Sequence, residues 1–338
     1  MASADGHEEW LRSSTEEPLD PDEVICDPHH HLWDGPGNRY VLEDLRADTG
    51  AGHRVERTVF VECTAGYRTT GPEELRPVGE TEFVARQASE SAGTPGAEIA
   101  AIVGFADLRL GRAVVEVLEA HVEAGGGRFR GVRHTSAWDA SPDVRRSHTR
   151  PPPGLLAEPA FRQGLAALGG MGLSFDAWLY HPQLRELAAM ARAHPEVSIV
   201  LDHVGGLLGI GPYADRPDEV LATWRAGMAE VASCPNVTLK VGGIGMPISG
   251  IAWSERPQPP TSRELADVWG DRLRWCIDTF GPDRCMFESN FPVDRQSCSY
   301  TVLWNCFQRI ASVYTPAERA ELFRHTAGRA YRLDELIR

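Results

Sequence analysis

Three consecutive histidines lie near the start of the chain, in the segment DPHHHLWD at positions 27–34. On a β-strand successive side chains alternate between two faces, so His29 and His31 project to one side and His30 to the other. Two imidazoles on one face can bind one metal ion or one anion, and histidine is the commonest metal ligand in proteins. The spacing therefore predicts a metal or anion site at His29 and His31, whereas His30 is expected to be structural.

Four further polar residues follow apolar segments, at positions where a buried strand would end. His181 stands in WLYHPQL, and His203 in VLDHVGG; Glu62 ends FVE, and Asn290 stands in FESNFPVD. One such histidine alone is more often a core or surface residue, but several at neighbouring strand ends would face one mouth. Asn290 offers an amide oxygen to a metal, or both a donor and an acceptor to a substrate. Glu62 supplies a carboxylate there, with a salt bridge to an arginine as the alternative.

Positive charge gathers at the ends of two more segments. The run RFRGVRH contains Arg130, Arg133 and His134, and Lys240 is the single lysine among 34 basic residues. An arginine is costly to bury unless it meets an anion, and its planar guanidinium binds a carboxylate at two points. These residues predict a site for a small anionic substrate, with internal ion pairs to Asp or Glu as the alternative.

The chain alternates between short β-branched runs and helical stretches, a pattern that would bring these residues together. Strand–helix alternation indicates a parallel sheet, and eight strands favour a closed α/β barrel, the (β/α)8 or TIM barrel. Active sites of such barrels lie at the C-terminal ends of the strands. The eight strands are predicted over residues 24–29, 57–63, 98–105, 128–134, 172–179, 197–203, 236–241 and 284–289.

A single barrel domain is expected over residues 24–338, preceded by a flexible acidic leader at 1–23. Three long connections without helical patterning are expected to cover the C-terminal face, at 135–158, 204–216 and 242–261. Tyr67 and Trp138 are candidates to line a planar substrate, with packing as the alternative. The outer ring of helices is expected to be completed by the helical stretches at 316–325 and 327–337.

The 338 residues include 48 acidic and 34 basic side chains, with a formal net charge of −14. This balance argues against binding to nucleic acid or to an anionic membrane surface. No apolar run approaches the roughly 18 residues of a membrane span, and the acidic leader lacks the apolar core of a signal peptide. Seven cysteines without a CxxC pair fit a reducing compartment. A cytoplasmic location is expected, and the oligomeric state, including a homo-oligomer, stays open.

The ordered motifs resemble those of the amidohydrolase superfamily. That pattern is HxH on the first strand, histidines at the fifth and sixth, and a polar residue ending the eighth. DPHHHLWD, WLYHPQL, VLDHVGG, NVTLKVGG and RCMFESNFPVD are each similar to motifs of its amidohydrolase-2 branch. The branch includes lactonases acting on pyrone dicarboxylates and sugar lactones, and metal-dependent decarboxylases.

The resemblance implies that His29, His31 and His181 hold one divalent ion, Zn or Mn, and that His203 is the acid–base group or polarises a carbonyl. The usual eighth-strand residue is Asp, which binds the metal and activates water. Asn290 stands at that position, and an amide can neither accept the proton as a carboxylate does nor ligate a metal as strongly. Metal-independent chemistry, as the lactonase members suggest, is therefore the alternative.

Hydrolysis of a small anionic lactone is the expected function. Arg133 and Lys240 would hold a carboxylate or oxyanion, His203 with His29 or His31 would polarise the carbonyl, and a water near Asn290 would attack. The base would then be His203 or a nearby carboxylate such as Glu62. The first alternative is a metal-dependent, non-oxidative decarboxylase or lyase of an aromatic or enoic acid. The second is a barrel that binds a ligand or catalyses a non-hydrolytic step.

Overall fold

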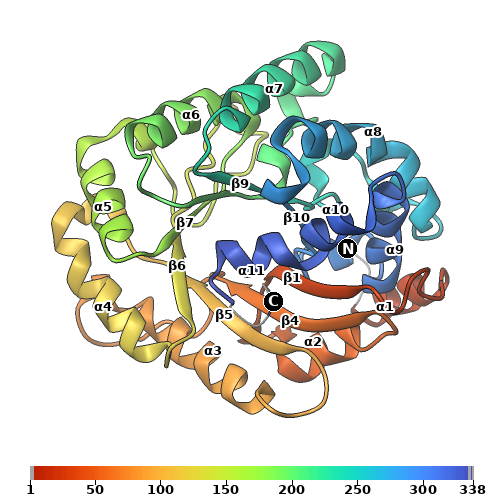
Figure 1. The fold of residues 1–338 in the computed structure, drawn as a ribbon, viewed down its shortest axis with the longest axis horizontal. Helices are drawn as coiled ribbons and strands as arrows, with labels where there is room; N and C mark the ends of the chain where they lie inside the picture. Colours follow the sequence, from red (N-terminus) through yellow and green to blue (C-terminus); the bar gives the residue numbers. More distant parts are fainter. Residues whose placement is uncertain (1–3, 334–335, 337–338) are drawn as a thin grey trace.

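Eight parallel strands form the barrel in chain order, with helices between them (Figure 1). The computed structural model describes residues 4–333 and 336. The fold class expected from the sequence is confirmed. The strands are β1 (Val24–His30), β4 (Arg54–Val61), β5 (Glu98–Gly104), β6 (Phe129–Arg133), β7 (Ser174–Ala177), β8 (Ile199–Leu201), β9 (Val237–Val241) and β10 (Cys285–Phe287).

The outer helices pack their apolar sides on the strands. In α6, Leu184, Leu187, Ala188 and Ala191 are buried at the i, i+3, i+4, i+7 spacing of one helix face. Small β2 (Trp33–Gly35) and β3 (Asn38–Tyr40) pair with each other beside the barrel. The helices are α2 (Leu42–Thr49), α3 (Val78–Ser91), α4 (Val114–Ala124), α5 (Pro159–Gly170), α6 (Leu184–Ala193), α7 (Pro217–Ala232), α8 (Ser262–Phe280), α9 (Tyr300–Ala311) and α10 (Pro316–Ala320).

The barrel closes through the segment that follows β10. The backbone N–H of Asn290 donates to the carbonyl of His29 at 2.9 Å, and that of His31 donates to the carbonyl of Phe291 at 2.7 Å. The buried carboxylate of Asp27 accepts hydrogen bonds from the Ser289 amide and from the Tyr300 hydroxyl, each at 3.0 Å. The first and last strands are therefore joined at the level of the histidine pair.

The last helix differs from the expected outer ring. Helix α11 (Thr326–Ala330) lies across the middle of the strand ring in Figure 1, rather than around its outside. Ala327, Ala330 and Tyr331 pack against inward-facing strand residues such as Val59 and Met286. The C-terminal segment therefore fills the interior below the site with the aromatic ring of Tyr331.

The start of the chain also differs from the expected flexible leader. Helix α1 (Ala4–Arg12) buries Leu11, and Glu8 pairs with Arg295. Further along, the carboxylate of Glu16 accepts a hydrogen bond from the Ser262 amide at 2.8 Å. These contacts attach the acidic segment to the barrel. No helix within the described part of the chain is both long and apolar enough to cross a membrane.

Candidate active site

A cavity of about 490 Å³ opens at the C-terminal ends of the strands. Each of the three long connections expected over this face contributes to its wall, through residues such as His148, Ile210 and Met246. The predicted site residues that line it are His31, Glu62, Arg133, His203 and Asn290.

The carboxylate of Glu288, just after β10, fixes the orientation of His203. Its Oε1 lies 2.7 Å from His203 Nδ1 and accepts the backbone N–H of His203 at 3.0 Å. Burial alone would raise the pKa of Glu288, but the imidazoles of His203 and His29 lower it to about 2. The ionised carboxylate therefore accepts the Nδ1 proton of His203, which leaves the lone pair on Nε2.

A glycine lets the backbone approach the ring of His203. Gly243 has φ +67, and a Cβ there would lie 2.7 Å from Cβ and Cγ of His203. The GG pair of NVTLKVGG is therefore needed for space as well as for backbone conformation. Trp178 packs edge-to-face on the other side of the imidazole, with ring centroids 4.8 Å apart.

His29 and His31 share a strand face, but only His31 reaches the cavity. Nδ1 of His31 lies 2.8 Å from the carbonyl oxygen of Val61, so Nδ1 donates and Nε2 keeps the lone pair. His29 is fully buried, with its Nε2 3.3 Å from Nη1 of Arg133 and its Nδ1 3.2 Å from Nζ of Lys240. Burial and the charge of Lys240 lower the pKa of His29, so the ring is neutral.

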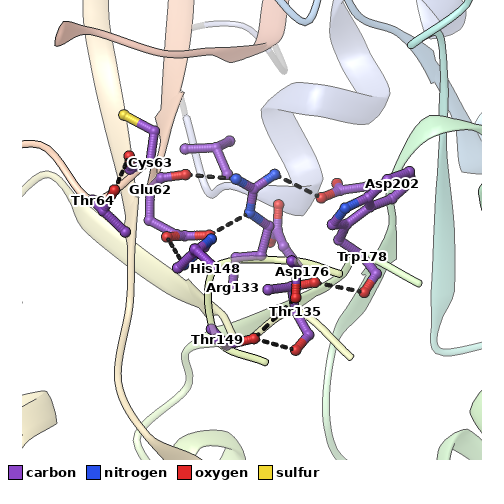
Figure 2. Close-up of polar contacts among 12 residues, drawn as sticks. Glu62, Cys63, Thr64, Arg133, Thr135, His148, Thr149, Asp176, Trp178 and Asp202 are labelled. Atoms are coloured by element: carbon purple, nitrogen blue, oxygen red, sulfur yellow. Dashed lines mark hydrogen bonds and ion pairs between the residues drawn. The ribbon is translucent and has the colours of Figure 1, made fainter. Parts of the chain in front are cut away.

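Arg133 takes part in an internal ion-pair group at the cavity wall (Figure 2). Its Nε donates to Glu62 Oε1 at 2.9 Å, and its Nη1 lies 3.6 Å from Oδ2 of Asp202. His148, on the 135–158 connection, places Nε2 3.1 Å from the other oxygen of Glu62. Burial would raise the pKa of Glu62, but Arg133 and His148 lower it, so the carboxylate is ionised. The salt-bridge alternative for Glu62 is thus what the structure shows.

Lys240 lies below the cavity and is completely buried. Its Nζ is 2.8 Å from Asp176 Oδ2 and 3.1 Å from Asp202 Oδ1. Burial would lower the pKa of Lys240, but the two carboxylates raise it, so the side chain is charged. The hydroxyl of Tyr331, beyond α11, donates to Asp176 at 2.6 Å. Lys240 is not among the residues that line the cavity, and it pairs with internal carboxylates instead of facing a substrate.

Five predicted site residues lie away from this centre. His181 turns its Nδ1 to the amide of Leu208 at 3.3 Å, and His134 accepts the amide of Leu108 at 3.2 Å. Arg130 donates to the carbonyl of Tyr331 at 2.8 Å, on the side of the barrel where the C-terminal segment lies. The structure does not bring His181 into the histidine cluster, since β7 ends at Ala177, four residues earlier. Outside the cavity lining are also Tyr67 and Trp138.

Asn290 has a left-handed backbone, with φ +55, which Asn tolerates better than most residues. Its Nδ2 donates to Asp294 Oδ1 at 2.8 Å, and the amide of Gly245 donates to the other oxygen of Asp294 at 2.7 Å. Burial raises the pKa of Asp294 to about 7. The Asn290 side chain therefore separates Asp294 from the cavity and satisfies it with an N–H donor.

Comparison with known proteins identifies the family of this chain. Residues 26–333 match the family described as Amidohydrolase. The chain belongs to the amidohydrolase family. A relative named L-fucono-1,5-lactonase from Burkholderia multivorans is 31% identical over 257 residues, which cover 76% of this amidohydrolase and 77% of the relative.

Two solved structures with this fold are described with a bound metal ion. One is an amidohydrolase from Burkholderia multivorans with bound zinc, 25% identical with TM-score 0.70, covering 92% of this chain and 99% of that one. Another is the 5-carboxyvanillate decarboxylase from Novosphingobium aromaticivorans complexed with manganese. At 11% identity and TM-score 0.57, over 94% of this chain and 100% of that one, it shows the fold alone.

One group of residues in this amidohydrolase has the spacing of a divalent-ion site. Among the described residues, His29, Asp202 and His203 can each offer one ligand atom within 4.8 Å of the others. Imidazole and carboxylate donors suit zinc or manganese, but the ligand atoms of His29 and Asp202 already have partners within the protein. Nδ1 of His29 donates to the ionised Glu288 at 2.9 Å and also faces Lys240, and its Nε2 faces Arg133. Asp202 pairs with Lys240 and Arg133. As arranged, the residues do not fit a divalent ion, and no chemical step is assigned to one.

The contact between Asn290 and Asp294 predicts the effect of restoring the usual family residue. In Asn290→Asp two carboxylates would face each other where an N–H donor now stands, so the pair would hold one proton. A carboxyl pKa raised by folding gives stability at low pH that is lost as the pH rises through the folded value. We expect the melting temperature of Asn290→Asp to fall more between pH 5.5 and 8.5 than that of the parent, by several degrees.

The matched control is Asn290→Gly, which keeps the left-handed backbone and adds no charge. Thermal unfolding followed by circular dichroism at both pH values measures the difference. Equal pH dependence in Asn290→Asp and Asn290→Gly would contradict the shared-proton arrangement.

Proposed function

We propose that this amidohydrolase opens a small anionic lactone by hydrolysis of its ester bond, with Nε2 of His203 as the general base. The observation that carries the proposal is the 2.7 Å contact between Nδ1 of His203 and Glu288, which leaves Nε2 unprotonated in a histidine that lines the cavity. The lactonase-named relative supports the choice of a lactone over an amide.

In the proposed reaction, His203 Nε2 takes a proton from water as the water oxygen attacks the lactone carbonyl. The resulting imidazolium is stabilised by the ionised Glu288, which keeps its hydrogen bond to Nδ1. The tetrahedral intermediate then breaks its bond to the ring oxygen, and Nε2 returns the proton to that oxygen. The product is an open-chain hydroxy acid, and the histidine is regenerated. Such a base contributes about 10²–10⁴-fold to the rate.

Arg133 is proposed to stabilise the negative charge that develops on the carbonyl oxygen. Two of its nitrogens donate to the side chain and backbone of Glu62 and a third faces His29, so the guanidinium is held rigidly at the cavity wall. A guanidinium carries five N–H groups, and those not engaged by these partners are available to an oxyanion. A preoriented donor of this kind is worth several kcal/mol in the transition state, on the order of 3.

The mouth of the cavity supports an anionic substrate. Arg145 and Arg146 are exposed on the 135–158 connection and line the cavity beside His148. On a chain with net charge −14, a local group of cationic side chains attracts an anion that the rest of the surface repels. We propose that these two arginines bind a carboxylate carried by the lactone ring.

His203 and Glu288 give the first test. We expect His203→Gln to lower kcat by about 10²–10⁴-fold, because the base is lost. In Glu288→Gln kcat should also fall, because the carboxylate that holds the Nδ1 proton of His203 and stabilises its imidazolium is lost. His181→Gln is the matched control and should keep kcat near the parent value. A His203→Gln variant with parental kcat would exclude His203 as the base, and parental kcat in Glu288→Gln would exclude the carboxylate's supporting role.

Substrate charge gives the second test. The double variant Arg145→Gln/Arg146→Gln should raise KM for a carboxylated lactone about tenfold and leave kcat largely unchanged. KM for the same ring without the carboxylate should not change. Arg150→Gln, an exposed position on the same connection that does not line the cavity, is the control. Equal effects on both lactones would contradict the assignment. Release of CO2 from an aromatic acid, with no lactone opening, would replace the hydrolase proposal by the decarboxylase alternative.

A further inference from the structure

A second cluster of ionisable side chains lies beneath the cavity, outside the proposed catalytic contacts. It consists of Lys240, Asp176, Asp202 and His29, and all four side chains are completely buried. Burying this many ionisable groups is costly unless each has a partner. The cluster shares His29 and Asp202 with the group that has metal-ligand spacing, although that group does not fit a metal ion as it is arranged.

The ammonium group of Lys240 lies against two carboxylates and the edge of an imidazole. Its Nζ lies 2.8 Å from Asp176 Oδ2, 3.1 Å from Asp202 Oδ1 and 3.2 Å from His29 Nδ1. The ring of Tyr331 covers it from another side, with Nζ 5.4 Å from the ring centroid. Lys240 thus occupies a closed cation site made of two carboxylates, an imidazole and an aromatic face.

Two of the residues around this ammonium also belong to the group that could ligate a divalent ion. Asp202 and His29 belong to the only His/Asp/Glu/Cys group with metal-ligand spacing in the described part of the chain. A zinc ion about 2.0–2.2 Å from Asp202 Oδ1 would compete with an ammonium that already lies 3.1 Å from that oxygen. The second nitrogen of His29 faces Nη1 of Arg133 at 3.3 Å. Nδ1 also lies 2.9 Å from the ionised Glu288 and donates its proton there, so the single lone pair of the neutral imidazole is on Nε2 and faces a cation.

The residue type at position 240 is informative in this chain. Lys240 is the single lysine among 34 basic residues. A guanidinium is planar and larger, whereas an ammonium is a compact point charge with three donors. A buried site with two carboxylates close to one nitrogen suits the ammonium better than the guanidinium. The single lysine of this arginine-rich chain therefore stands where the geometry favours a compact cation.

We propose that the ammonium of Lys240 is the built-in cation of this barrel, taking the place that a divalent ion has among the histidine and aspartate donors. The protein then needs no metal ion for its fold or its site, and removal of the Lys240 side chain exposes a latent divalent-cation site. This inference concerns metal binding in the absence of any substrate, so it stands or fails independently of the proposed lactone hydrolysis.

The experiment measures zinc bound per chain in tag-free protein that has been stripped with EDTA and then dialysed against zinc. Elemental analysis should find little zinc in the parent and about one ion per chain in Lys240→Ala. The double variant Lys240→Ala/Asp202→Asn separates this site from the other histidines of the chain and should return to the parental level. Zinc should also raise the melting temperature of Lys240→Ala, and not that of the parent.

Two results would overturn the proposal. One is a parent protein that binds one zinc per chain and loses it in Asp202→Asn, because the ion and the ammonium would then coexist. The other is a folded Lys240→Ala that binds no more zinc than the parent. Lys240→Met, which removes the charge but fills most of the volume, provides a second variant if Lys240→Ala does not fold. In that case zinc binding to Lys240→Met above the parental level supports the proposal, and its absence contradicts it.

Discussion

The carboxylate of Glu288 between two imidazoles is the interaction on which the rest of the site depends. One oxygen holds Nδ1 of His203 at 2.7 Å, and the other lies 2.9 Å from Nδ1 of His29. A buried carboxylate is tolerated only where neighbouring groups compensate its charge. The same compensation fixes the tautomer of His203 and leaves its Nε2 free. Folding stability and chemical competence thus arise from the same contact.

The fold supports this contact from both ends of the strands. Above, the segment after β10 is held against β1 by the buried carboxylate of Asp27, so Glu288 and His29 face each other across the barrel seam. Below, α11 brings the hydroxyl of Tyr331 to Asp176, which in turn anchors Lys240. The interior of the barrel is therefore layered. An apolar base carries a buried ionic layer, and the ionic layer carries the open cavity.

Much of this arrangement could be predicted from the sequence, because a barrel places strand ends in one mouth. His31, Glu62, Arg133, His203 and Asn290 all lie at or just beyond the ends of predicted strands, and all line the cavity. His148 could not be found in this way, since it lies in a connection without periodicity and reaches Glu62 only through the path of that connection. The acids Asp176, Asp202 and Glu288 lie in β7 or directly after β8 and β10, and all three turn inward. Their positions within predicted strands are a signal that the sequence already contains. His181 and Arg130 show that position in a predicted strand does not by itself place a side chain in the site. The first lies beyond the point where β7 ends, and the second points to the opposite end of the barrel.

The most direct measurement of the central claim is the protonation pattern of His203 itself. Nitrogen-15 chemical shifts of the histidine side chains, assigned by comparison with His203→Gln, distinguish the two neutral tautomers of an imidazole. The account predicts that the neutral ring of His203 carries its proton on Nδ1 and none on Nε2. A neutral ring protonated on Nε2 would contradict it, because the nitrogen facing the cavity could not then accept a proton from water.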